Sequence, residues 1–180
     1  MKQKPAVITS EYLYRGKIIN LRYDTVDING CPAGREIIEH SGGATALAVM
    51  NGQVYFVRQY RHPYNSEVLE LPAGKIEPGE DPLATIRREL QEEVGIYDAS
   101  LEAAGIIYPS PGYTDEVIYL FYTEHFKISD IQNLDADECL DIVRYDIETV
   151  YQMVDSGAII DAKTLVLLYK YRHRLLNNGK

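Results

Sequence analysis

The chain is organised around the stretch GKIEPGEDPLATIRRELQEEVGI, residues 74–96, which decides the fold. Its spacing predicts a loop followed by one helix. Asp81 suits the N-cap, and Pro82 suits the first helical position, where its missing N–H costs nothing. Gly95 stands where a helix commonly ends in a left-handed residue. Aliphatic residues at helical spacing predict the buried stripe of this helix: Leu83, Ile86, Leu90 and Val94.

Glutamates gather on one side of the predicted helix. Glu89 and Glu93 are one turn apart and project side by side, and Glu92 flanks them. Three like charges this close destabilise a bare helix, and a hard divalent cation would reverse that penalty because it prefers carboxylate oxygens. Most glutamate-rich turns are simply solvated, so these three residues alone leave both interpretations open. Arg88 offers a guanidinium that could hold Glu80 or one of the helix carboxylates.

The complete pattern resembles the Nudix box, GX5EX7REUXEEXGU, in which U is a bulky aliphatic residue. Nine spaced identities carry the resemblance: Gly74, Glu80, Arg88, Glu89, Leu90, Glu92, Glu93, Gly95 and Ile96. It implies an α/β fold of the α+β type, a Nudix-like α/β/α sandwich with a mixed sheet. It further implies that Mg²⁺, or Mn²⁺ in its place, is held by Glu89, Glu92, Glu93 and the backbone carbonyl of Ala73. Glu80 and Arg88 complete the implied catalytic set.

Composition narrows the class of protein. With 180 residues and 46% hydrophobic content, the chain suits one globular domain with a sizeable core. The formal net charge of −9 argues against a nucleic-acid partner. Cys31 and Cys139 are too few for a disulfide framework and favour a reducing compartment. The first ten residues lack the apolar core of a signal peptide, and no apolar run reaches membrane-spanning length, so we expect a cytoplasmic protein without a membrane partner.

Turn signals divide the chain into elements. Asn29-Gly30 and Asn51-Gly52 are hairpin turns between apolar runs, which predicts an N-terminal antiparallel sheet. Two helices are expected near the C-terminus, over residues 147–156 and 162–176. We assign residues 1–42 to an N-terminal β region and residues 43–180 to the Nudix hydrolase domain, within one folding unit overall.

Two further stretches are similar to the ADP-ribose pyrophosphatases of this family. One is EVLELPAGKIEPGE, residues 67–80. The other is Ser110-Pro111-Gly112, in which Pro111 stands sixteen residues past Gly95 and an acidic residue follows. The resemblance implies hydrolysis of ADP-ribose to AMP and ribose 5-phosphate. Related GDP-mannose hydrolases also carry SPG, so a GDP-mannose or other nucleoside diphosphate sugar hydrolase is the alternative enzyme. A sensor domain that binds ADP-ribose without cleaving it is the non-catalytic alternative, and the intact box counts against it.

The same resemblance assigns substrate contacts. Arg61 is the candidate for the phosphates, Glu70 for an orienting contact, and Pro111 and Gly112 for the substrate loop. Arg58 and Arg61 end one predicted strand, where each could equally be a solubilising residue. Members of the family are commonly homodimers that exchange N-terminal strands, which would bring Arg35 near the nucleobase of the substrate bound to the partner subunit.

The catalytic base has two candidates. An acidic stretch covers residues 130–141, and such runs are usually solvated loops. In the family, a glutamate that acts as the catalytic base stands shortly before a strand at this point, and Glu138 matches it best. Glu116, after the proline loop, is the alternative. Leu140 stands where some members have another metal-binding glutamate, which leaves Asp137 and Asp141 as substitutes.

Overall fold

The computed structural model describes residues 4–129 and 140–177. They form two compact units. The N-terminal unit contains the chain up to Gly42 together with Tyr108–Val117, and the sheet unit contains Gly43–Ile107 and the chain from Ile118 onward. The segment 108–117 therefore groups with the N-terminal strands, although the sequence assigned it to the hydrolase domain. A division into compact units does not show whether the units fold together, so the single folding unit stays a prediction.

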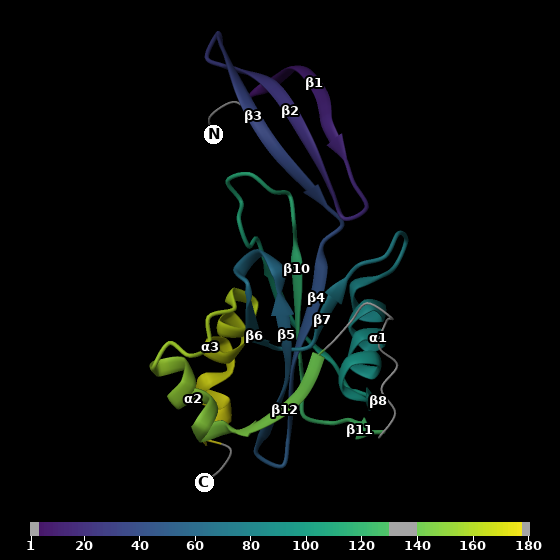
Figure 1. Cartoon of the computed structure of the whole chain (residues 1–180), viewed down its shortest axis with the longest axis vertical. Helices are drawn as coiled ribbons and strands as arrows, with labels where there is room; N and C mark the ends of the chain where they lie inside the picture. The colour runs from purple at the N-terminus through teal and green to yellow at the C-terminus, as the bar shows by residue number, and fades with distance from the viewer. Residues whose placement is uncertain (1–3, 130–139, 178–180) are drawn as a thin grey trace. The chain divides into compact units, whose positions relative to one another are not determined.

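The N-terminal unit is a three-stranded antiparallel sheet in the order β1-β2-β3 (Figure 1). Its strands are β1 (Ala6–Arg15), β2 (Ile19–Ile28) and β3 (Cys31–His40). Asn29 and Gly30 join β2 to β3 with φ values of 54° and 83°, the left-handed pair that a two-residue hairpin requires. Ile38 of β3 donates its N–H to the Tyr113 carbonyl at 2.7 Å, which ties the loop 108–117 to this sheet.

The sheet unit is built on a mixed sheet, as the Nudix resemblance predicts. Its main path runs β12-β5-β4-β10-β9, with β6 paired to β5 and β7 paired to β4. Strand β10 is parallel to β4, and the other pairs are antiparallel. The bounds are β4 (Gly43–Met50), β5 (Gln53–Arg61), β6 (Ser66–Glu70), β7 (Ala73–Lys75), β9 (Glu102–Ile107), β10 (Ile118–Thr123) and β12 (Leu140–Asp146); the short pieces are η1 (His62–Tyr64), β8 (Ile96–Tyr97) and β11 (Lys127–Ile128).

Helices cover both faces of this sheet (Figure 1). The side chains of β4 alternate between the two faces, which explains how both are covered. Ala44, Ala46 and Ala48 pack toward α1 (Pro82–Val94), where small side chains let the helix approach closely. Leu47 and Val49 point the other way, toward α2 (Ile147–Asp155) and α3 (Ala162–Asn177). The predicted α/β/α sandwich is confirmed.

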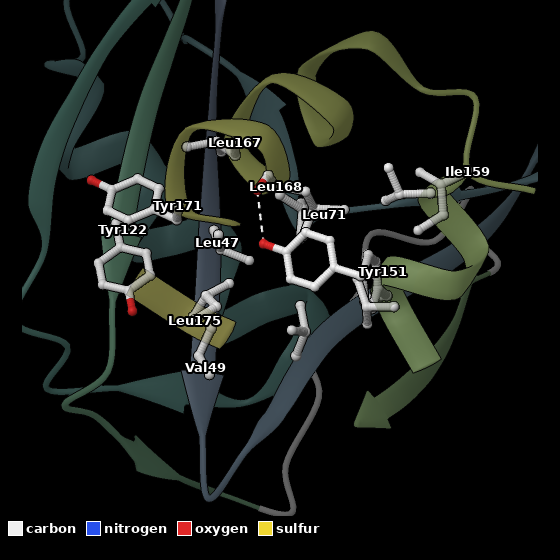
Figure 2. Close-up of a cluster of buried hydrophobic side chains, with 14 of the residues drawn as sticks. Leu47, Val49, Leu71, Tyr122, Tyr151, Ile159, Leu167, Leu168, Tyr171 and Leu175 are labelled. Carbon is white, nitrogen blue, oxygen red and sulfur yellow. Dashed lines mark hydrogen bonds between the residues drawn. The ribbon is translucent and has the colours of Figure 1, made fainter. Parts of the chain in front are cut away.

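Tyrosines organise the core beneath α2 and α3 (Figure 2). Tyr151 of α2 donates its hydroxyl to the Leu168 carbonyl of α3 at 2.8 Å, so the two helices are joined by a buried hydrogen bond. Tyr122 of β10 stacks on Tyr171 of α3 with ring centroids 4.0 Å apart. These contacts fix α3 against the sheet. Across the described ranges, none of the helices is long and apolar enough to cross a membrane.

Candidate active site

Helix α1 begins at Pro82 and ends at Val94, as predicted. Gly95 ends it with φ 68°, and its N–H bonds the Gln91 carbonyl at 3.2 Å. Asp81 occupies the N-cap position, as predicted, although its side chain makes no capping hydrogen bond. The carboxylate of the neighbouring Glu80 accepts a hydrogen bond from the Thr85 hydroxyl at 2.8 Å.

Arg88 is the centre of the box. It donates Nε and Nη2 to the two oxygens of Glu80 at 3.1 and 3.2 Å. Its Nη1 lies 2.7 Å from Glu89 Oε1 and 2.8 Å from Glu92 Oε2. One guanidinium thus holds the loop carboxylate and two helix carboxylates together, which joins the two possibilities that the sequence left open. These hydrogen bonds raise the pKa of Arg88 despite its partial burial, and the bond to Glu80 has the largest effect.

Gly74 and Ala73 of β7 lie against the helix carboxylates of Glu89 and Glu93. A Cβ added to Gly74 would come within 1.8 Å of Glu89 Oε1, so the carboxylate occupies the space that any side chain would need. Ala73 donates its N–H to Glu93 Oε2 at 3.0 Å. Glu89 and Glu93 are 7% and 3% exposed, and a solvated acidic face is thereby excluded for both. Whether the Ala73 carbonyl contacts a metal stays a prediction.

The donor set fits a divalent cation chemically. Two carboxylates, those of Glu89 and Glu92, already converge on one cationic nitrogen of Arg88. Carboxylate oxygens are what Mg²⁺ and Mn²⁺ prefer, and Glu93 follows Glu89 by one helical turn. In the part of the chain that the structure describes, no three acidic, histidine or cysteine side chains form a ready-made metal cluster. The metal ligands therefore stay predictions, with Arg88 holding two of them.

Gly74→Ala will separate activity from stability. The added methyl group must displace the Glu89 carboxylate, which is the far end of a flexible side chain, so we expect kcat/KM to fall by about 10–100-fold, the range for changes that misorient a metal-binding group without removing it. The thermal midpoint should fall by only a few degrees, roughly. In a Glu89→Ala background the same change should cost little further activity, because nothing remains to displace. Full additivity of the two losses would contradict this explanation.

Acid will remove the contribution of the Glu80–Arg88 pair. Hydrogen bonding from Arg88 is the largest effect and lowers the pKa of Glu80 from 4.5 to about 2, because the Thr85 hydroxyl and the Glu77 backbone N–H add to it and together they outweigh the opposing effect of burial. Because the folded value lies below the unfolded one, the pair stabilises the fold fully above pH 4.5 and loses this effect as the pH falls toward 2. The difference in unfolding free energy between wild type and Glu80→Gln should therefore shrink across that interval, measured by urea denaturation. An equal difference at pH 7 and pH 3 would contradict the assignment.

Arg61 and Glu70 contact each other directly. Arg61 Nε and Nη2 donate to the two Glu70 oxygens at 2.6 and 2.8 Å, and Lys163 of α3 donates to the same carboxylate. Burial raises the pKa of Glu70, but these two cations outweigh it and the net pKa is lowered. The sequence analysis missed Lys163, because 93 residues separate it from Glu70 and no local spacing links them.

Arg58 lies on the opposite face of β5 from Arg61. It donates Nη2 to the Tyr145 hydroxyl at 2.9 Å, and Tyr145 packs beside the core of α2 and α3. Residues three apart on a strand point to opposite faces, so only one of the two arginines can lie on the α1 face. That residue is Arg61.

The remaining predicted residues belong to the N-terminal unit, to β12 or to the part of the chain outside the described ranges. Arg35, Pro111 and Gly112 are exposed in the N-terminal unit, where Arg35 donates Nη1 to the Gly34 carbonyl at 2.7 Å. Glu116 belongs to the same unit, and its carboxylate lies 3.4 Å from His40 Nδ1. Glu138 and Asp137 lie outside the described residues. Asp141 is exposed at the start of β12.

Comparisons with known proteins show what the chain as a whole is similar to. A family model described as NUDIX domain matches residues 40–167. The chain is 36% identical over 160 residues to an ADP-ribose pyrophosphatase of Bacillus subtilis (strain 168), covering 87% of this chain and 86% of that protein. It is 32% identical over 192 residues to a GDP-mannose pyrophosphatase of Yersinia enterocolitica, covering 98% of this chain and all of that protein. A crystal structure of an ADP compounds hydrolase superposes with a TM-score of 0.84, at 21% identity over 98% of this chain and 97% of that chain, which shows the shared fold.

The fold and the box define the class: an α/β/α sandwich whose first helix carries glutamates gathered around one arginine. The chain belongs to the NUDIX family, and it is a pyrophosphohydrolase of that family, as the box predicts.

Proposed function

We propose that the protein hydrolyses the diphosphate bond of ADP-ribose to AMP and ribose 5-phosphate, with Mg²⁺ as cofactor and Mn²⁺ as the alternative ion. The observation that carries the proposal is the group of Glu89, Glu92 and Glu80 around Arg88, with Arg61 on the same face of the sheet. The Bacillus subtilis relative named ADP-ribose pyrophosphatase, and the position of Pro111, support the choice of substrate.

The residues divide the work of the reaction. When bound, Mg²⁺ would neutralise the diphosphate oxygens and lower the pKa of the attacking water. Glu89, Glu92 and Glu93 would hold it, while Glu80 keeps Arg88 in place. The water oxygen forms a new bond to one phosphorus as the bridging P–O bond breaks, and two phosphomonoesters leave.

Phosphate binding and proton transfer fall to other side chains. Arg61 presents a guanidinium, whose shape matches phosphate oxygens bidentately. Hydrogen bonds to Glu70 raise the pKa of Arg61 despite burial, with a smaller contribution from the charge of Glu93, so Arg61 is cationic throughout. We assign the removal of the water proton to Glu138, on the sequence resemblance alone.

A GDP-mannose or other nucleoside diphosphate sugar hydrolase is the second candidate. The Yersinia enterocolitica relative, named GDP-mannose pyrophosphatase, favours it because the similarity extends over nearly all of this chain. The chemistry at the diphosphate would be the same, and the nucleobase contacts would differ. An ADP-ribose sensor without activity is the third candidate, and the complete box counts against it.

A substrate panel decides among the three. ADP-ribose, GDP-mannose, NADH and diadenosine polyphosphates carry no terminal phosphomonoester, so a phosphatase releases phosphate only after the diphosphate bond is cut. We expect ADP-ribose to give the highest kcat/KM with Mg²⁺. A clear preference for GDP-mannose would replace the proposal with the second candidate. Tight binding of ADP-ribose without hydrolysis of any compound would favour the sensor.

We also propose that the protein is a homodimer with exchanged N-terminal strands, which would bring Arg35 near the partner's nucleobase. All ten residues of β1 are exposed, and they include Val7, Ile8 and Leu13 at more than half exposure. Apolar side chains in such a strand favour coverage by another chain. A monomeric mass by sedimentation at micromolar concentration would contradict this. The cytoplasmic location and the absence of a nucleic-acid partner stay predictions.

A further inference from the structure

We infer that Lys163 is a positioning residue for phosphate recognition: it fixes the buried Glu70 carboxylate, which presents Arg61 to a phosphate group. The inference rests on the proposed function and deepens it by adding α3 to the substrate site. Neither the Nudix box nor the other stretches that resemble ADP-ribose pyrophosphatases include this residue.

Glu70 is built into the sheet rather than offered to solvent. It is 3% exposed, and in the β5–β6 ladder it stands opposite Val57, whose side chain packs in the core under α1. Residues directly opposite in an antiparallel pair share a face, so Glu70 lies on the α1 face of the sheet. A buried carboxylate needs cationic or polar partners on both oxygens. Arg61 supplies a partner to each oxygen, and Lys163 shares one of them.

Arg61 is held along one edge only. Its Nε and Nη2 are used by Glu70, while Nη1 has no hydrogen-bond partner among the residues that the structure describes. Its side chain is 41% exposed, against 4% for that of Glu70. A guanidinium gripped on one edge keeps donors on the other, and such a fork is pre-organised for phosphate oxygens.

Lys163 is held too firmly to be a flexible substrate contact. Its side chain is 12% exposed, and besides Glu70 it donates to Asp161 Oδ1 at 3.0 Å. Asp161 in turn accepts the Thr164 N–H at 3.0 Å, so the carboxylate that holds the lysine is itself fixed at the start of α3. The lysine therefore acts through Glu70 and Arg61, not on the substrate.

A structural role for the start of α3 is also visible, and it supplies a control. Thr164 accepts the N–H of Leu71 through its hydroxyl at 2.9 Å, which anchors the residue directly after Glu70. Thr164→Val removes this anchor but leaves all the charges in place. If Lys163 merely fastened α3 to the sheet, its loss would resemble the loss of Thr164.

Steady-state kinetics of the full-length protein with Mg²⁺ and ADP-ribose test the inference. Lys163→Met should raise KM by about tenfold with kcat within about twofold of wild type, because uniform substrate binding is weakened and the chemistry is not. Lys163→Arg should restore most of the affinity. Lys170→Met, which removes the same charge from an exposed position of α3, should behave as wild type. Lys163→Gln replaces the methionine variant if that variant does not fold.

Coupling to Arg61 is the decisive measurement. In an Arg61→Gln background, Lys163→Met should add less than about twofold to KM, because the residue through which it acts is gone. A full tenfold addition in that background would overturn the inference. So would a Lys163→Met variant that matches Thr164→Val, with a lowered thermal midpoint and an unchanged KM.

Failure of this inference can be told apart from failure of the proposed function. If wild type hydrolyses none of the panel, the proposed function fails, and calorimetric titration with ADP then measures the diphosphate affinity of the same variants. Weaker ADP binding by Lys163→Met than by Lys170→Met would still support the inference. If wild type is active and the two lysine variants are alike, the inference alone fails. A wild type that neither cleaves nor binds any diphosphate would overturn both.

Discussion

Replacing Glu93 by glutamine will remove nearly all turnover, with kcat lowered by about 10³-fold or more at saturating Mg²⁺, because a ligand charge is lost from the metal centre. The change removes little volume. Glu93 is 3% exposed, and its Oε2 accepts the Ala73 N–H at 3.0 Å, a bond that the amide oxygen of glutamine can also accept. Loss of activity should therefore not arise from misfolding.

Stability of the metal-free protein separates the two effects. Relief of repulsion between Glu93 and Glu89 favours the glutamine variant by a few tenths of a kcal/mol, roughly, and the weaker bond to Ala73 opposes it. We expect the unfolding free energy to change by less than about 1 kcal/mol in urea titrations. Glu148→Gln, at an exposed position of α2, is the matched control and should keep full activity. Near-normal kcat for Glu93→Gln would end the proposal that this residue binds the metal.

Glu138→Gln will lower kcat by roughly 10²–10⁴-fold, the usual share of general-base catalysis, with little change in KM or in the Mg²⁺ dependence. The prediction rests on the sequence, in which Glu138 precedes β12 by two residues, at the place where the family carries its base. Strand β12 is paired to β5 from Leu140 opposite Gln59 onward, and Arg61 ends that same strand β5.

Glu116→Gln is the comparison for the base, and it should do less to kcat. The Glu116 carboxylate lies 3.4 Å from His40 Nδ1, and its backbone N–H donates to the Thr114 hydroxyl at 3.1 Å. These contacts are typical of a residue that shapes a turn. Should Glu116→Gln prove the more damaging change, with Glu138→Gln close to wild type, the base would be Glu116 and the metal centre would be unaffected.

Local patterns in the sequence were sufficient for the helix that carries the site. Pro82 and Gly95 mark its ends, and the aliphatic spacing predicts the face that Ile86 and Leu90 bury completely. The hairpin turns at Asn29 and Asn51 were equally readable, because a left-handed pair of residues needs Asn and Gly at the turn itself. Helical periods, caps and tight turns act over a few residues, so one sequence is enough to recognise them.

The side-chain contacts of the acidic residues before the helix were only partly readable from the pattern. Asp81 and Glu80 are adjacent acidic residues before the helix, and propensity favours Asp81 as the cap. Asp81 does occupy that position, while the Glu80 carboxylate accepts hydrogen bonds from Thr85 and Arg88. The fork of Arg88 is a stronger partner than a backbone N–H, and it recruits the longer side chain.

Contacts between distant segments required the tertiary structure. Gly74 against Glu89, and Lys163 against Glu70, join residues whose spacing along the chain follows no period. Strand geometry alone places Arg58 and Arg61 on opposite faces, but only the elements packed on each face decide that Arg61 is the one on the α1 side. The glutamates of α1 could thus be recognised as a group before folding, but what each of them touches depends on strands and helices that arrive from elsewhere in the chain. Packing, unlike local backbone conformation, is decided by pairing over long range, and a single sequence carries no periodic signal for it.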